Sequence, residues 1–193
     1  MRTLVFLLEG PSEKEALQAW LPHWLPEDVQ ARFIVFEGKQ DMERQMVRKL
    51  RGWQQTHTTF IVLRDQDSAD CRQVKAGLQA RCAEAGRPDA VVRIACHELE
   101  SFFLGDWAAV AAAFDNPALA RLDRSSTYRE PDHIALPARE LERHIPGYQK
   151  RDGARRIAPH MQLGHNRSRS FCHLRNAILH AAATPSSTRP SEP

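Results

Sequence analysis

The sequence has little cysteine, no long apolar run and few motifs of the common enzyme classes. Its apolar start, Met1 to Leu8, is interrupted by Glu9 and is too short for a signal peptide or a membrane span. We therefore expect a cytoplasmic protein with no membrane partner. The four cysteines are scattered without a CxxC pair, which argues against a structural zinc site and, in the cytosol, against disulfides. We expect reduced, mostly buried thiols.

Three missing motifs exclude further classes of protein. Without a GxxxxGK[ST] loop, the chain cannot by itself be a P-loop motor. Without a GxSxG elbow, it lacks the turn that presents the nucleophile of a serine hydrolase. The zincin motif HExxH is also absent, because His97-Glu98 is not followed by a second histidine at helical spacing.

Length and composition are those of one globular domain, since the chain has 193 residues, of which 42% are apolar and 26% are charged. We predict a single domain over residues 1–183, with an α/β core over 1–106 and a helical extension over 107–183. Residues 184–193 are rich in Ser, Pro and Thr, and we expect them to be a disordered tail.

Charge is distributed unevenly along the chain. Residues 1–138 carry 17 Lys and Arg against 20 Asp and Glu, whereas residues 139–193 carry 10 against 4. The basic C-terminal part could neutralise the phosphates of a nucleic acid, although a solvated helical surface would show the same pattern.

Strand and helix patterns alternate four times in the first half of the chain. Short β-rich runs over residues 3–8, 32–36, 58–63 and 90–95 are each followed by a helical pattern or a polar turn. We expect the first helix to begin with a capping box from Ser12 to Glu15, and Asp70 to cap the third. Such alternation predicts an α/β fold with a mostly parallel, Rossmann-like four-stranded sheet flanked by helices.

The rest of the chain is expected to be mainly helical. We predict helices over residues 107–114, 137–144, 153–162 and 170–182. Residues 115–136 have little periodicity and are expected to form a loop or an inserted helical excursion.

Acidic residues stand where three of the four predicted strands end. Glu9 follows the first strand, Asp65 and Asp67 follow the third, and Glu98 and Glu100 follow the fourth. Because parallel strands end at one edge of a sheet, these side chains can converge there. Carboxylates gathered without matching cations repel one another unless a divalent cation lies among them, and Mg²⁺ fits such a cluster best. One of Glu98 and Glu100 is expected to be a solvated bystander.

Two of these sites resemble the motifs of the Toprim (topoisomerase-primase) fold. The strand-end Glu9-Gly10 and the later Asp65-x-Asp67 stand in the order that this fold requires. More narrowly, the chain resembles an uncharacterised bacterial family, domain of unknown function 4276. Further matching features are Gly38-Lys39, Glu98-x-Glu100 leading into Phe102-Phe103, Tyr148-x-Lys150 and Ser170-Phe171.

The resemblance implies a Toprim-like nuclease that cuts phosphodiester bonds with Mg²⁺, or with Mn²⁺ in vitro. It implies Glu9 as the general acid/base and Asp65 and Asp67 as metal ligands, with Glu98 or Glu100 as an additional acidic ligand. The chain departs from many Toprim sequences in having Ser68-Ala69-Asp70, with no glycine, after the second aspartate. The candidate phosphate contacts are Lys39, Lys150, Arg155 and Arg156.

Two other functions stay open. The first is a non-catalytic Toprim-like module that regulates a partner, for example a separately encoded ATPase, as fusions among nuclease relatives suggest by analogy. The second is an aspartyl-phosphate phosphatase built on Asp65-x-Asp67, which is disfavoured because that motif normally opens its domain. For the nuclease, the sequence does not distinguish DNA from RNA as the substrate.

Overall fold

The four predicted strands form one parallel sheet in the computed structural model, which describes residues 1–183. In the order β2-β1-β3-β4, each strand is parallel to its neighbours. The predicted α/β class with a parallel, Rossmann-like sheet is therefore confirmed, and the tail at 184–193 lies outside the described residues. The strands are β1 (Arg2–Leu8), β2 (Val29–Val35), β3 (Thr58–Asp65) and β4 (Val91–Ala95).

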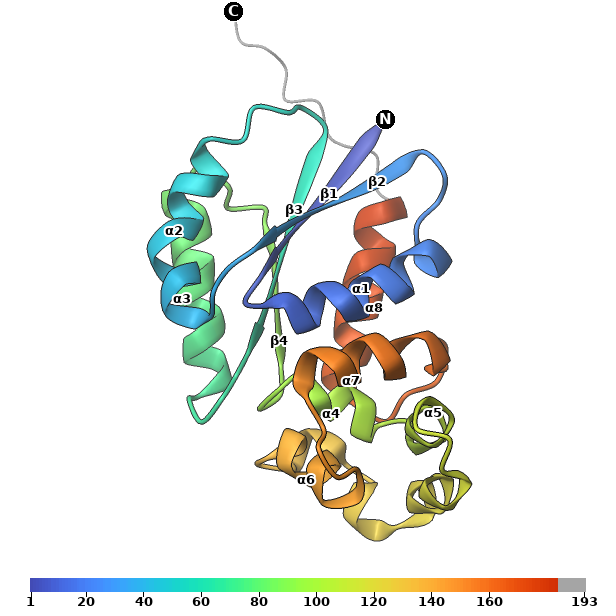
Figure 1. Cartoon of the computed structure of the whole chain (residues 1–193). Helices are drawn as coiled ribbons and strands as arrows, with labels where there is room; N and C mark the ends of the chain where they lie inside the picture. The colour runs from blue at the N-terminus through green and yellow to red at the C-terminus, as the bar shows by residue number, and fades with distance from the viewer. Residues whose placement is uncertain (184–193) are drawn as a thin grey trace, which may run out of the picture.

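Helices cover both faces of this sheet (Figure 1). Side chains alternate across each strand, so Leu4 and Phe6 of β1 face one layer while Val5 and Leu7 face the other. The first layer contains α1 (Pro11–Trp24), α7 (Lys150–Ile157) and α8 (Arg169–Ala183). The second contains α2 (Lys39–Arg51) and α3 (Cys71–Glu84).

The direction of the crossovers reverses between β1 and β3. The chain passes from β1 outward to β2 through α1, then returns past β1 to β3 through α2 on the opposite face. The connections after β1 and β3 therefore leave to different sides of the sheet and open a crevice at the carboxyl ends of these two strands. In open parallel sheets this is the place where ligands bind.

The chain beyond β4 is helical, as predicted, but the helical extension begins at Glu100 rather than at residue 107. Helix α7 begins at Lys150 rather than at residue 153, and the segment over 115–136 consists mainly of 3₁₀ turns. The helices of this extension not yet named are α4 (Glu100–Leu104), α5 (Trp107–Ala113) and α6 (Pro137–His144). The 3₁₀ turns are η1 (Pro117–Arg124), η2 (Ser126–Tyr128), η3 (Pro131–His133) and η4 (Ala158–His160).

Two expectations about helix starts had different outcomes. The capping box from Ser12 to Glu15 was wrong, because Pro11 starts α1 and makes Gly10 the N-cap residue. Glu13, in the first turn of α1, instead accepts a hydrogen bond from the Gly10 amide at 3.1 Å. The cap by Asp70 is confirmed, since its side chain accepts from the Gln73 amide at 2.9 Å.

The four cysteines differ in how far they are buried. Cys82 is buried, whereas Cys71, Cys96 and Cys172 are partly exposed, so the expectation of mostly buried thiols was wrong. Within residues 1–183, no helix combines the length and the apolar character that crossing a bilayer requires.

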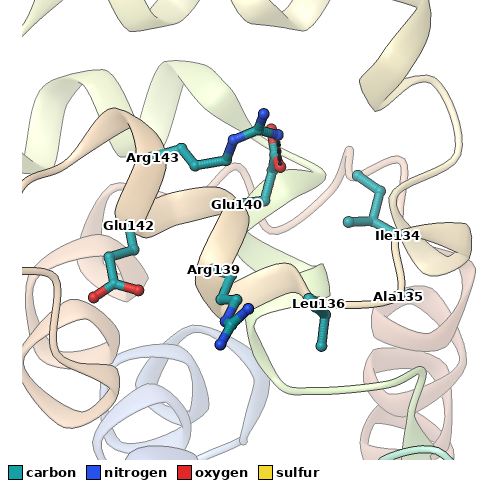
Figure 2. Close-up of a pocket in the computed structure, with 7 residues that line it drawn as sticks. All are labelled: Ile134, Ala135, Leu136, Arg139, Glu140, Glu142 and Arg143. Carbon is teal, nitrogen blue, oxygen red and sulfur yellow. Dashed lines mark hydrogen bonds and ion pairs between the residues drawn. The ribbon is translucent and has the colours of Figure 1, made fainter.

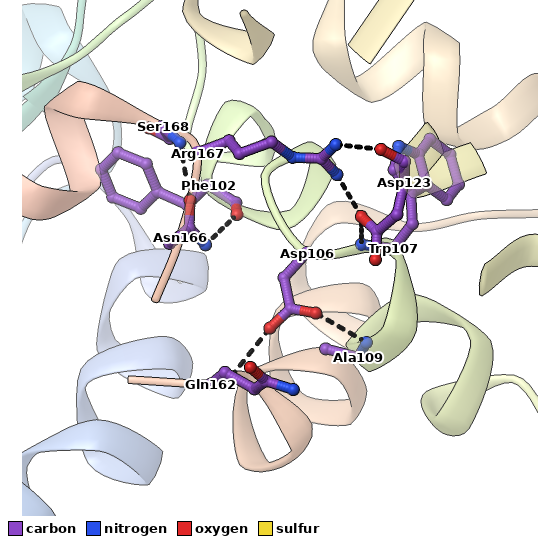
Figure 3. A network of polar contacts seen from close by, with 9 residues as sticks. All are labelled: Phe102, Asp106, Trp107, Ala109, Asp123, Gln162, Asn166, Arg167 and Ser168. Carbon is purple, nitrogen blue, oxygen red and sulfur yellow. Dashed lines mark hydrogen bonds and ion pairs between the residues drawn. The ribbon is translucent and has the colours of Figure 1, made fainter. Parts of the chain in front are cut away.

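A polar network fastens the segment before α8 to the start of the extension (Figure 3). Asp106 accepts hydrogen bonds from the amides of Ala109, at 3.0 Å, and Gln162, at 2.8 Å. Asn166 donates to the Phe102 carbonyl at 2.9 Å. The backbone at Gly105 lies so close to Asn166 that an added Cβ would be 2.1 Å from its Oδ1. These contacts hold residues far apart in sequence at a fixed separation.

Removing the Asp106 carboxylate should destabilise the folded protein. Asp106→Ala removes the cap of α5 and leaves a second amide without its acceptor, which should lower the free energy of unfolding by about 1–3 kcal/mol. Asp89→Ala, at an exposed position before β4, is the matched control and should change it by less than about 0.5 kcal/mol. Urea unfolding at pH 7 measures both, and equal values would contradict this role of Asp106.

Candidate functional site

A cavity of about 260 Å³ lies in the crevice at the carboxyl ends of β1 and β3. Glu9 follows β1 directly, Glu13 is in the first turn of α1, and Asp65 is the last residue of β3. Glu100 and Lys150, the first residues of α4 and α7, also line it, as does Glu37 beyond the end of β2. We call the cavity around Glu9, Glu13, Asp65, Glu100 and Lys150 the acidic cavity.

The carboxyl groups of the acidic cavity are deeply buried and poorly satisfied. Glu13 is 5% exposed, Asp65 9% and Glu100 0%. Among the described residues, Glu9 Oε2, Asp65 Oδ1 and Glu100 Oε2 are buried and have no hydrogen-bond partner. Because buried polar groups in folded proteins are nearly always hydrogen-bonded, three unpartnered oxygens around one cavity indicate acceptors available to a ligand.

Burial and mutual repulsion favour the protonated forms of these groups. Burial raises the pKa of Glu13 to about 7, and the charges of Glu9 and Glu100 add to the increase. Burial also raises the pKa of Asp65 well above its ordinary value, helped by Glu13 and Glu100, and raises that of Glu100. For Glu9, burial and then Asp67 raise the pKa, while Arg64 and Lys39 oppose them in part.

Two cations partly offset this negative charge. Lys150 Nζ donates to Glu98 Oε1 at 2.6 Å and lies 3.6 Å from Glu100 Oε2. Burial acts to lower the pKa of Lys150, but Glu100 and Glu98 outweigh it and raise the pKa, so the amine stays protonated. Arg64 Nε lies 3.6 Å from Glu9 Oε2, although the same guanidinium also donates to Glu43 at 2.6 Å. The cavity keeps an excess of carboxyl groups over cations.

Asp67, predicted to act beside Asp65, lies outside the acidic cavity. Its backbone has φ of +56°, a left-handed conformation that turns the chain after β3. Its side chain accepts from Lys39 Nζ at 2.8 Å, and its amide donates to the His97 carbonyl at 2.7 Å. The structure thus brings Asp65 together with Glu9 and Glu100, and pairs Asp67 with Lys39 instead.

Glu98 and Glu100 have different surroundings. Glu98 Oε2 accepts from the Ala138 amide at 2.9 Å, so it satisfies a free donor in the first turn of α6. Glu100 lines the cavity, and its Oε1 accepts from the Tyr148 hydroxyl at 3.3 Å. The Tyr148 ring packs directly on α7 at Gly153, where an added Cβ would be 2.2 Å from it.

Two of the predicted phosphate contacts are held within the protein. Arg155 donates to Asp152 at 2.6 Å. Arg156 lies over the Phe114 ring, 4.0 Å from its centroid, and donates to the Ala113 carbonyl at 2.9 Å. Neither arginine lines the acidic cavity, whereas Lys150 does.

A larger hollow of about 560 Å³ lies beside α6, away from the strand ends (Figure 2). Its charged groups include Arg143, which donates to Glu140 at 2.9 Å, and the Tyr128 hydroxyl bonds to the same glutamate. None of its lining residues, which all fall in the described part of the chain, has a buried polar atom without a partner. The smaller cavity is therefore the candidate site, because its buried carboxylate oxygens lack hydrogen bonds and the larger hollow has no such groups among its lining residues.

Glu13 was missed by the sequence analysis, although the sequence contains a signal for it. Proline is favoured at the first helical position, so Pro11 predicts a helix start at Gly10-Pro11. Glu13 then lies in the first turn, directly beyond the strand end that carries Glu9. Because the predicted start of this helix was Ser12, Glu13 was not recognised as a neighbour of Glu9.

The donor set of the acidic cavity suits a small divalent cation. No cysteine or histidine lines it, and its free donors are carboxylate oxygens, which favour Mg²⁺ or Mn²⁺ over zinc. Within residues 1–183, no three His, Cys, Asp or Glu side chains converge closely enough to hold one ion in this conformation. Mg²⁺ commonly uses only one or two protein carboxylates and completes its shell with water and substrate oxygens, so a three-residue cage is not required.

Comparison with known proteins gives one match. The family model described as Domain of unknown function (DUF4276) matches residues 8–179. This range includes all the residues of the acidic cavity, and it confirms the predicted family; the Toprim-like assignment stays a prediction. No curated protein and no solved structure matches the chain.

Glu13→Gln should make the metal-free protein more stable at high pH. Because the pKa of Glu13 rises from 4.5 to about 7 on folding, the unfolded chain loses this proton first, and stability falls as pH rises across that interval. Glutamine has no proton to lose, so Glu13→Gln should raise the free energy of unfolding by about 1–3 kcal/mol at pH 8 and leave it unchanged near pH 4.

Urea unfolding in EDTA at both pH values measures this effect. Glu142→Gln, at an exposed position on α6, is the control and should show no pH-dependent gain. An effect of Glu13→Gln that is the same at pH 4 and pH 8 would contradict the raised pKa.

Proposed function

The chain belongs to the DUF4276 family, and we propose that it is a Mg²⁺-dependent phosphodiesterase of Toprim-like type that acts on nucleic acid. The observation that carries the proposal is the set of three buried carboxylate oxygens, on Glu9, Asp65 and Glu100, that accept no hydrogen bond within residues 1–183, of which Asp65 Oδ1 also lacks an ion pair. Ionised carboxylates in such a place need a cation, and a divalent metal ion is the simplest one that also binds phosphate.

Asp65 and Glu100 are the residues that would hold the metal ion, with Glu9 beside them as the general acid/base. Bound there, Mg²⁺ would supply a Lewis acid for a phosphate oxygen and a water molecule that is easier to deprotonate. Asp67 would join them only if its ion pair with Lys39 opened. We therefore assign Asp67 to a position at the edge of the site.

Glu9 has the properties of a general acid/base. Its side chain is 17% exposed, so it contacts both the buried cluster and solvent. Burial raises its pKa toward neutral pH, where a carboxyl group can both accept and donate a proton. Arg64, 3.6 Å away, restrains the orientation of Glu9 and keeps it from becoming fully protonated.

The order of the strand-end acids supports a phosphodiester substrate. Glu9-Gly10 after β1 and Asp65-x-Asp67 after β3 stand on adjacent parallel strands, as the Toprim resemblance requires. Lys150 lines the cavity, and Lys39, which is paired with Asp67, follows the lining residue Gly38. Arg155 and Arg156 are expected to contribute less to substrate binding, because contacts within α7 and with the segment after α5 hold them.

Divalent metal binding should depend on pH and on Asp65. Binding must release the protons that burial holds on the cavity carboxyls, so affinity for Mn²⁺ should fall at least about tenfold between pH 7.5 and pH 5.5. Asp65→Asn should remove the binding, and Glu142→Gln should preserve it. Isothermal titration calorimetry in two buffers of different ionisation enthalpy measures both the affinity and the released protons. Unchanged binding by Asp65→Asn would refute this location.

Nucleic acid cleavage should require the same residues. Purified protein with Mg²⁺ or Mn²⁺ should cut plasmid, single-stranded DNA or RNA, and EDTA should stop the reaction. Glu9→Gln and Asp65→Asn should each lower the rate at least about 100-fold while circular dichroism stays unchanged. Metal binding without cleavage, even after addition of a candidate ATPase, would instead favour the non-catalytic module.

A further inference from the structure

A second cavity, of about 450 Å³ and lined by both basic and apolar side chains, runs along the open edge of β4. In the described part of the chain β4 pairs only with β3, so its other edge is not covered by a strand. The N-terminal turn of α3 lines one side of the cavity and that of α8 lines the other, from opposite faces of the sheet (Figure 1). We call it the β4 groove; its unpaired basic lining residues are Lys75, Arg93, Arg169 and His173.

In the described part of the chain, no carboxylate forms an ion pair with Lys75, Arg93 or Arg169 of the β4 groove. Within residues 1–183, neither Lys75 nor Arg169 takes part in an ion pair or a side-chain hydrogen bond. Arg93 is partly buried, yet it donates only to the carbonyls of His173, at 3.2 Å, and Val92, at 2.8 Å. Arg64, also buried, instead has carboxylate partners. Burial of an arginine without a carboxylate is costly unless an anion binds there.

The acidic groups around the groove are already engaged. Asp132 Oδ1 accepts from Ser168 Oγ at 2.6 Å and from Ser170 Oγ at 3.1 Å, and Oδ2 accepts from the Ser170 amide at 2.8 Å. This carboxylate therefore fastens the first turn of α8. His133, at the rim, pairs with Glu130 at 2.7 Å. Asp132 keeps its charge in the groove, but none of the other four basic lining residues, all in the described part of the chain, forms an ion pair with it, so basic groups outnumber acidic ones in the lining.

The groove opens next to the acidic cavity. In the sheet, Asp65 of β3 is the register partner of Ala95 of β4, and the next residue, Cys96, lines the groove. Adjacent strands are about 4.8 Å apart, so the end of the groove lies one strand away from the end of β3. A polyanion that follows the edge of β4 would arrive at the carboxyl ends of β3 and β1.

We infer that the β4 groove binds the phosphate backbone of a nucleic-acid strand and leads that strand to the acidic cavity. The inference rests on the proposed function for what happens to the strand in the cavity, but not for the binding itself. Lysine and arginine that neutralise phosphates release counterions, which gives binding that is independent of sequence and weakened by salt. Arg93 lies on β4 itself, and its guanidinium fork suits phosphate oxygens.

Binding of a fluorescent single-stranded 20-nucleotide DNA or RNA, measured by anisotropy in EDTA, tests the inference without metal or cleavage. Lys75→Glu/Arg169→Glu should raise the Kd at least about tenfold and reduce the slope of log K against log salt by about 1–2. Arg32→Glu/Lys49→Glu, with the same charge change on β2 and α2, is the matched control and should stay within about twofold of the wild type. Both double variants change exposed or partly exposed side chains without ion pairs, so their melting temperatures should match that of the wild type.

The outcomes separate the groove from the proposed activity. Equal Kd values for the two double variants, or no binding by the wild type, would overturn the inference. Competition by inorganic phosphate or a mononucleotide at the same phosphate concentration as the oligonucleotide would also overturn it, in favour of a small phosphate ligand. Groove-dependent binding by a protein that cuts no nucleic acid would support the groove and reject the proposed function.

Discussion

The surrounding structure depends on one constraint: several carboxyl groups are buried around a single lysine at the carboxyl ends of β1 and β3. Each carboxylate loses hydration there and repels its neighbours, so the ionised cluster would not persist without compensation. Arg64 supplies part of it at Glu9, and Lys150 supplies part at Glu100. Within residues 1–183, Asp65 Oδ1 has neither a hydrogen bond nor an ion pair, and it is the part of this charge that the protein leaves for a ligand.

The helical extension completes the cavity that the α/β core begins. Helix α4 provides Glu100, and α7 provides Lys150. Helix α7 packs against α1. Trp20 of α1 donates to the carbonyl of Ala158, the residue that follows α7, at 3.2 Å. The network around Asp106 then fixes the segment that leads into α8. Core and extension therefore share one hydrophobic cluster, and the cavity lies where they meet.

The sequence predicted the sheet and part of the site because both follow from simple periodicity. Parallel strands end at one edge, which placed Glu9, Asp65 and Glu100 together correctly. The rest depended on local conformation or distant contacts that periodicity does not encode. Asp67 turns to Lys39 because its backbone is left-handed, and Glu98 caps a helix 40 residues away. The β4 groove joins segments from α3, β4 and α8, so no local pattern indicated it.

The central claim is that the acidic cavity holds a divalent metal ion. Anomalous diffraction from crystals soaked in Mn²⁺ at pH 7.5, with Asp65→Asn crystals as the control, tests it most directly. The account predicts a manganese peak within direct or water-mediated reach of Asp65 and Glu100 in the wild type, and no such peak in the variant. Well-occupied manganese elsewhere on the protein, with these carboxylates unliganded, would contradict it.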